Sequence, residues 1–202
     1  MSAAVDAWHR TVLRDEHGYL AHPHLIRAAN ELLLVCNWAP RRSFVLHPPE
    51  DPLYLNLLLR SQDEGETWSA PVVAPANGWN GVECAGLTDL GQGRVLLNQW
   101  RFRWLTLPAA EALADRSAIA WPGQLLAAHL ASSEHEDAGL TADMAEQLLP
   151  WARCPGRAWT HLSDDGGRTW RLSVELTTYP FSGGYGMRGG VVLPDGTIFL
   201  PL

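Results

Sequence analysis

The sequence predicts an all-β protein built from repeated antiparallel sheets. Two observations lead to this prediction. Short apolar runs alternate with turn residues, and the motif Ser-x-Asp-x-Gly-x-Thr-Trp occurs twice, at 61–68 and 163–170. Each copy follows a set of three apolar runs, so the order of the parts repeats as well. Repeats of this kind form the blades of β-propellers, in which a four-stranded sheet buries its faces against its neighbours.

The apolar runs fall into three sets, each of which reads as the strands of one sheet. The first set is Tyr19–Ile26, Leu32–Trp38 and Leu53–Leu59. The second set is Val82–Thr88, Val95–Trp100 and Ala158–Leu162. The third set consists of Met187–Leu193 and Thr197–Leu202, which flank the turn Pro194, Asp195 and Gly196.

The first two sets also resemble each other residue by residue. Leu33, Leu34, Trp38, Arg41 and Arg42 align with Leu96, Leu97, Trp100, Arg101 and Arg103. Counting the sets gives about two and a half blades, whereas closed propellers have about 4 to 8 blades. We therefore expect residues 1–202 to be part of a longer propeller, or else several copies to complete one ring.

The two motifs are 163 − 61 = 102 residues apart, which is more than one blade requires. Residues 105–150 are rich in Ala, Leu and Glu and predict a helical insertion in the second blade. We expect helices at Ala109–Leu113 and Thr141–Leu149, with Thr141 as the N-cap residue.

Both motif copies predict a structural hairpin turn. Ser and Asp side chains cap backbone N–H groups, Gly adopts a conformation that other residues resist, and Trp packs under the turn. The fixed positions are Ser61, Asp63, Gly65, Thr67 and Trp68 in the first copy and Ser163, Asp165, Gly167, Thr169 and Trp170 in the second. We expect these residues to stabilise the fold and not to take part in catalysis.

Composition excludes several classes of function. The formal net charge of −7 argues against nucleic-acid binding, which needs a basic face. Cys36, Cys84 and Cys154 have no CxxC spacing and the 8 His residues no HExxH spacing, so no metal, cofactor or disulfide framework is expected. The sequence has no signal-like leader and no transmembrane segment, so we expect a cytoplasmic chain, unless it is part of a longer protein.

The two motif copies resemble the Asp boxes, or bacterial neuraminidase repeats, of the sialidase (neuraminidase) superfamily. That resemblance implies a six-bladed propeller, of which this chain would form about two and a half blades. It also implies three arginines for the substrate carboxylate, an Asp as acid and base, and a Tyr nucleophile activated by a Glu. The first arginine is expected where this sequence has Ala21, in the stretch Ala21-His22-Pro23-His24-Leu25. A later arginine and the acid/base Asp match Arg41 or Arg42 and Asp51. The alternative for Asp51 is an ordinary charge in an exposed loop.

Alignment of the three predicted inner strands suggests a ligand site. His22 precedes Leu25 by three residues, Cys84 precedes Leu87 by three, and Arg188 precedes Val191 by three. Inner strands line the central axis of a propeller, so these positions should converge with Glu83 near one mouth of the channel. Tyr185 lies in the glycine-rich stretch beside Arg188 and is a candidate to stack on a sugar. The alternative is that these polar groups are merely solvated.

Three functions remain open. The first is an exo-acting, sialidase-like glycoside hydrolase for an acidic sugar, with Arg188 and Arg41 or Arg42 as carboxylate ligands and Asp51 as the proton carrier. The second is a non-catalytic propeller that binds a glycan or scaffolds a complex, favoured by Ala21. The third is a polysaccharide lyase-like propeller that uses His22 or His24 with Tyr185. The expected partner is a carbohydrate in all but a purely scaffolding role.

Overall fold

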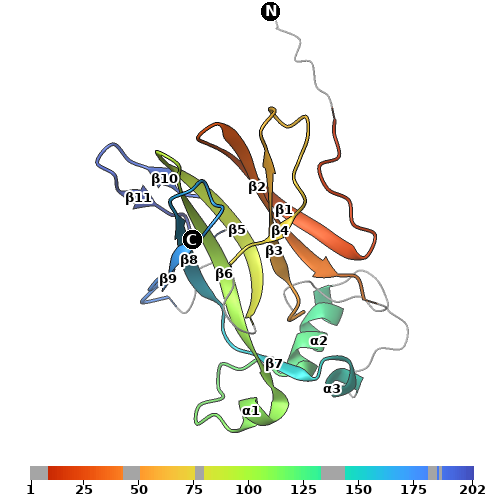
Figure 1. The fold of residues 1–202 in the computed structure, drawn as a ribbon. Coiled ribbons are helices and arrows are strands. Elements are labelled where there is room, and N and C mark those ends of the chain that lie inside the picture. Colours follow the sequence, from red (N-terminus) through yellow and green to blue (C-terminus); the bar gives the residue numbers. More distant parts are fainter. Residues whose placement is uncertain (1–8, 43–50, 76–79, 133–143, 182–185, 187) are drawn as a thin grey trace, which may run out of the picture.

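The computed structural model describes residues 9–42, 51–75, 80–132, 144–181, 186 and 188–202. The described chain is mostly antiparallel β-sheet, with three short helices at one end (Figure 1). No helix in these ranges combines the length and the apolar character needed to cross a membrane.

The first sheet has the strand order β1-β2-β3-β4. Its strands are β1 (Gly18–Ala28), β2 (Glu31–Pro40), β3 (Leu55–Ser61) and β4 (Val72–Val73). The second sheet has the order β5-β6-β8-β9, with β7 paired to the far end of β6. Its strands are β5 (Asn80–Gly91), β6 (Arg94–Thr106), β7 (Trp151–Arg153), β8 (Arg157–Ser163) and β9 (Arg171–Glu175). The six strands predicted for the first two sets are therefore present, with somewhat different bounds.

The third set is shorter than predicted. Only β10 (Val191–Val192) and β11 (Ile198–Phe199) pair, around the predicted turn. The expected strands Met187–Leu193 and Thr197–Leu202 are thus too long within the described residues, and Met187 lies outside them.

Both sheets carry the same β-bulge in their first strand. In the first sheet the register shifts between Ala21 and His24, and in the second it shifts after Glu83. The residues inside the two bulges, His22 and Cys84, have positive φ angles of 49° and 43°. A non-glycine residue in this left-handed region is uncommon and marks local strain. The two bulges are equivalent positions of the repeat.

The register corrects one detail of the predicted repeat. Leu34 pairs with Leu25 and Leu97 with Leu87, but Ala21 pairs with Asn37 while Glu83 pairs with Trp100. Trp100 is therefore the equivalent of Asn37, and its predicted alignment with Trp38 is wrong by one residue.

The main apolar core joins the two sheets. Its buried members are Ala28, Leu33, Val35, Leu58, Ala74, Ala85, Leu87, Val95 and Leu97. They come from β1, β2 and β3 of the first sheet, from β5 and β6 of the second, and from the residue that follows β4. Alternate residues of a strand face opposite sides, so the sheets pack through one face each and leave the other for further contacts.

Residues 105–150 contain α1 (Leu107–Glu111), α2 (Pro122–Ser132) and α3 (Ala145–Leu148). The predicted helix at Ala109–Leu113 is present but begins and ends two residues earlier. Only the C-terminal part of the one predicted at Thr141–Leu149 is described; its N-cap is Met144, and Thr141 lies outside the described residues.

Helices α2 and α3 cover a second core at the end of the sheets where β3 and β5 begin (Figure 1). Leu125 and Leu126 of α2 join a cluster that includes Tyr54, Phe102 and Trp104. This cover excludes water from the interior beneath Tyr54, which is only 1% exposed.

The two Ser-x-Asp-x-Gly-x-Thr-Trp segments form the same turn at the opposite end of the sheets. Ser61 pairs with Leu32 beside the β1–β2 hairpin, and Ser163 pairs with Val95 beside the β5–β6 hairpin. In the first copy Gly65 N donates to Ser61 Oγ (2.8 Å), and Thr67 N donates to Asp63 Oδ1 (2.8 Å). The second copy repeats both bonds, at 2.7 Å and 2.8 Å.

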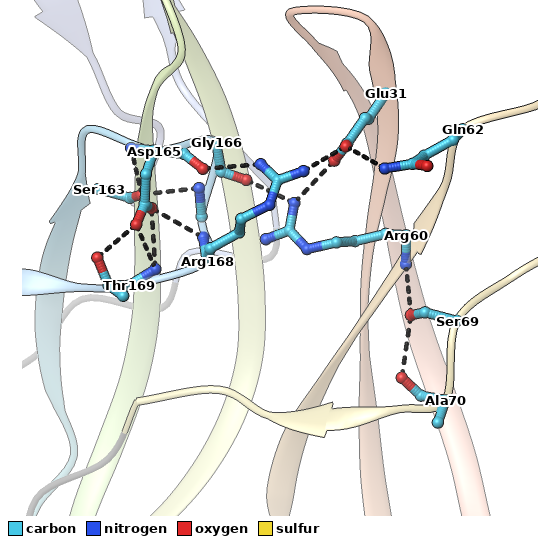
Figure 2. Close-up of polar contacts among 11 residues, drawn as sticks. Glu31, Arg60, Gln62, Ser69, Ala70, Ser163, Asp165, Gly166, Arg168 and Thr169 are labelled. Atoms are coloured by element: carbon cyan, nitrogen blue, oxygen red, sulfur yellow. Dashed lines mark hydrogen bonds and ion pairs between the residues drawn. The ribbon is translucent and has the colours of Figure 1, made fainter.

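The second turn is also tied to the first sheet (Figure 2). Arg60 on β3 donates to the Gly166 carbonyl (2.7 Å), and Arg60 and Arg168 both bind the carboxylate of Glu31. Gln62 donates to the same carboxylate (2.7 Å). These contacts give the two segments a role in holding the sheets together.

The two turns should make the stability of the fold depend on pH in acid, because each contains an Asp with a lowered pKa. Hydrogen bonds from Thr67 lower the pKa of Asp63 from 3.8 to about 2, and hydrogen bonds from Thr169 hold the pKa of Asp165 well below its ordinary value. A carboxylate with a depressed folded-state pKa stabilises the fold above its unfolded pKa, and this stabilisation is lost as pH falls through the folded value. We expect the melting temperature to fall between about pH 4 and pH 2, and to fall less in an Asp63→Asn/Asp165→Asn double variant. Parallel curves for the two proteins would contradict this assignment.

Candidate functional site

The first strands of the two sheets, β1 and β5, lie next to each other and bring their bulges together. The His22 Nδ1 and Cys84 Sγ atoms are 3.8 Å apart. With a carboxylate oxygen of Glu83 they form a group in which all three atoms lie within 4.8 Å of one another. Glu83 is 4% exposed and Cys84 fully buried, whereas His22 is partly exposed. Solvent therefore reaches this group at His22.

Asn37 fixes the ring of His22. Its Nδ2 lies 3.0 Å from His22 Nδ1 and donates to Tyr54 Oη (2.6 Å). An amide nitrogen donates but does not accept, so His22 Nδ1 is the acceptor and carries no proton in this arrangement. Burial is the main cause that raises the pKa of Tyr54, which keeps its phenol neutral.

The same hydrogen-bonded chain crosses into the second sheet. Asn37 Oδ1 accepts from Asn56 (2.7 Å), and Asn56 Oδ1 accepts from Gln99 (3.0 Å). Gln99 Oε1 then lies 2.9 Å from His161 Nε2, whose Nδ1 lies 3.2 Å from the Ser173 hydroxyl. Burial, and then the charge of Arg101, lower the pKa of His161 to about 4, so this ring is neutral near pH 7 and donates through Nε2.

Asp51 is buried and pairs with the partly exposed Arg42. Arg42 donates to both Asp51 oxygens, from Nε at 2.6 Å and from Nη2 at 3.0 Å, and Leu53 N adds a bond of 2.9 Å. Asp51 is only 2% exposed, so the interpretation of this residue as part of an exposed loop is wrong. The hydrogen bond to Asp51 raises the pKa of Arg42. Oδ1 of Asp51 accepts two of these three bonds and Oδ2 accepts one, so Oδ2 keeps one acceptor site.

Backbone hydrogen bonds of Tyr54 connect the Asp51 segment to the start of β5. Tyr54 N donates to the Asp51 carbonyl (3.0 Å), and Val82 N donates to the Tyr54 carbonyl (2.9 Å). Val82 directly precedes Glu83 on β5. These two hydrogen bonds place Asp51 at the same end of the sheets as His22 and Glu83.

Arg188 joins β5 a few residues further along. Its carbonyl accepts from Asn98 Nδ2 (3.1 Å), and Gly190 N donates to Thr88 Oγ1 (2.7 Å). Burial of His24 is the main cause that lowers the pKa of His24, and the positive charge of the Arg188 guanidinium lowers it further. Arg188 is therefore near His24 and exposed, and its backbone packs against Gly86 and not against the bulge.

A separate groove of about 580 Å³ lies at the other end of the sheets. It is lined by Leu58, Arg60, Ser69, Ala70, Val72, Val73, Pro75, Gly167, Arg168 and Trp170. The lining is mainly apolar, and it contains none of the residues that the sequence predicts for ligand binding.

Comparison with solved structures relates this arrangement to known folds. A protein of unknown function from Dyadobacter fermentans is 17% identical, with a TM-score of 0.65 over 93% of this chain and 47% of that one. The NanB sialidase of Streptococcus pneumoniae, solved with 2-[(3-chlorobenzyl)ammonio]ethanesulfonate, is 10% identical, with a TM-score of 0.56 over 95% of this chain and 42% of that one. The fold is sialidase-like.

The likeness is one of fold alone. The chain spans less than half the length of these two structures. No protein-family model matches the sequence, and no curated protein matches it.

Within this sialidase-like fold the other predicted residues are placed as follows. Ala21 lies in β1 opposite Asn37, so a methyl group occupies the position where the resemblance implies an arginine. Arg41 is exposed, and its backbone N donates to the His17 carbonyl. Tyr185 lies outside the described residues.

Sequence reasoning missed the amide residues of the interior. Asn37, Asn56 and Gln99 are each 2% exposed or less and belong to the hydrogen-bonded chain. Their signal is an amide within an otherwise apolar strand, as in Leu-Val-Cys-Asn-Trp and Leu-Leu-Asn-Gln-Trp. A polar side chain in a buried run needs a partner, so such amides indicate a buried network.

Proposed function

We propose that this chain forms about two and a half blades of a sialidase-type β-propeller that hydrolyses an acidic sugar as an exo-glycosidase. The observation that carries the proposal is that the equivalent bulges of β1 and β5 meet, which brings His22 and Glu83 together at the end of the sheets that holds Asp51 and Arg42. Polar groups that converge where two elements meet are typical of ligand sites. The NanB sialidase shares this fold, which supports the reaction class by analogy.

The roles follow from the contacts. Arg42 uses the Nε–H and one Nη2–H to hold Asp51, which leaves two N–H donors on Nη1 and one on Nη2 for a substrate carboxylate. A substrate carboxylate on these donors shares the guanidinium charge with Asp51, which weakens the Asp51–Arg42 pair and favours proton uptake by Asp51. Asp51 then gives its proton to the glycosidic oxygen as the acid and later takes a proton from water as the base. Arg188 supplies a second positive charge near His24.

A non-catalytic glycan-binding propeller is the second candidate, and Ala21 favours it. Loss of a guanidinium at that position removes one bidentate carboxylate ligand, and Asn37, which faces Ala21, already donates to His22 and Tyr54. In this second candidate the same residues bind the glycan but do not hydrolyse it.

Turnover of a fluorogenic sialoside and of other acidic glycosides by the product of the complete gene separates the two candidates. We expect Asp51→Ala and Arg188→Ala each to lower kcat/KM by about 100-fold or more. Arg171→Ala is the matched control, because Arg171 pairs with Asp164 at the other end of the sheet and is expected to leave kcat/KM unchanged. A folded protein that binds the sugar without turnover supports the binding propeller. Turnover that survives both substitutions contradicts the proposed site.

A further inference from the structure

His22, Glu83 and Cys84 are the one group of three or more metal-binding side chains found together among the described residues. They offer an imidazole nitrogen, a carboxylate oxygen and a thiol sulfur, which together are a ligand set that Zn²⁺ accepts. The group did not show as a local motif, because His22 is on β1 and the other two residues are on β5, 61 or more positions away.

The spacing fits a single ion. Ordinary Zn–N and Zn–S bonds at a tetrahedral angle place the two ligand atoms about 3.6 Å apart. The His22 Nδ1 and Cys84 Sγ atoms are 3.8 Å apart, and the Glu83 oxygen is within 4.8 Å of both. Shifts of a few tenths of an ångström between nitrogen and sulfur, and up to about one for the carboxylate, bring all three onto one ion.

The backbone supplies a second observation. His22 and Cys84 each have a positive φ at the equivalent bulge of their strand. Strained conformations of this kind persist where the surrounding structure holds them, and they cluster at functional sites. Here the two bulges aim both side chains at the same point between β1 and β5.

The hydrogen bond from Asn37 leaves a lone pair on His22 Nδ1. Because Asn37 Nδ2 is a donor, His22 Nδ1 accepts this bond and carries no proton that a metal would have to displace. A metal exchanges this hydrogen bond for a coordinate bond, and Cys84 binds as the thiolate with release of its proton.

We propose that His22 Nδ1, Glu83 and Cys84 Sγ bind one Zn²⁺ ion, with the fourth position open to water or a ligand oxygen. Three protein ligands and one open position are typical of catalytic zinc sites, whereas structural sites are closed by four. The proposal rests on the geometry of β1 and β5 and does not require the glycosidase function, since metal binding is measured without any sugar.

The test is a titration of the metal-stripped protein with Co²⁺ alone, followed by displacement with Zn²⁺ alone. We expect one Co²⁺ per chain, with a thiolate-to-cobalt charge-transfer absorption that Zn²⁺ removes. Cys84→Ser should lose the absorption, and Cys154→Ser, the matched control at a thiol outside the group, should keep it. His22→Asn, whose side chain tolerates a positive φ, and Glu83→Gln should each weaken binding at least 10-fold.

Two results overturn the proposal. One is the absence of any saturable Co²⁺ absorption in the wild-type protein. The other is an absorption that Cys84→Ser keeps and Cys154→Ser loses, which assigns the metal to a different thiol. If Cys84→Ser does not fold, thermal unfolding decides: Zn²⁺ should raise the melting temperature of the wild type but not of Glu83→Gln, and an equal rise in both contradicts the site.

Discussion

Replacement of Asn37 by leucine is expected to lower the free energy of unfolding by about 3 kcal/mol or more, although the two side chains have similar volumes. Asn37 is fully buried and makes three side-chain hydrogen bonds, to His22, Tyr54 and Asn56. Leucine leaves these three groups without this partner, and each buried group left unsatisfied costs about 1 to 3 kcal/mol. Denaturant unfolding of the wild type and the variant measures the difference.

Gln62→Leu is the matched control. Gln62 is an exposed amide whose side chain donates to Glu31, so the same change should cost less than about 0.5 kcal/mol. Equal losses in the two variants would show that the buried amide chain does not hold the sheets together. We also expect Asn37→Leu to weaken sugar binding, because the His22 ring loses the contact that orients it.

Alanine at Gly86 is expected to displace the segment around Arg188 and to cost about 3 kcal/mol. A Cβ atom at Gly86 meets the carbonyl carbon of Arg188 at 2.1 Å, its oxygen at 2.2 Å and Gly189 N at 2.3 Å. All three atoms belong to the backbone, so no side-chain rotation relieves the contact. The shift breaks the bonds from Asn98 to Arg188 and from Gly190 to Thr88.

The variant is checked by its melting temperature and by its affinity for the acidic sugar, and both should fall. Gly123→Ala is the control, since its Cβ meets no atom within 4 Å and the residue lies in α2. Alanine there should leave stability unchanged or raise it by about 0.5 kcal/mol. A Gly86→Ala protein with wild-type stability and affinity would contradict the placement of Arg188 against β5.

The sequence predicts the strands and turns well because their signals are local. Short apolar runs and the Ser-x-Asp-x-Gly-x-Thr-Trp pattern act over fewer than ten residues, and the structure contains strands and turns at these places. The repeat also carried a longer-range inference: equal offsets from Leu25 and Leu87 placed His22 and Cys84 at equivalent positions, and the structure puts them 3.8 Å apart. Whether they bind a ligand stays a prediction.

The rest depends on contacts between distant segments, which a local pattern does not contain. Asp51 stands among prolines and reads as exposed, yet Arg42 and the Tyr54 turn bury it. Trp38 stands four residues after Leu34, whereas Trp100 stands three after Leu97, so a match by residue type aligned the two Trp residues although the pairing sets them one position apart. The convergence of His22, Glu83 and Cys84 was predicted, but the metal that we propose for them was not, because ligands on two strands have no local metal-binding spacing.

We propose that this protein binds an acidic sugar where β1 and β5 meet. A crystal structure of the product of the complete gene, soaked with sialic acid, tests this site. We expect the sugar within contact distance of His22 and Glu83, with its carboxylate toward Arg42 or Arg188. Sugar bound instead in the groove between Arg60 and Trp170, with the β1–β5 end unoccupied, would contradict it.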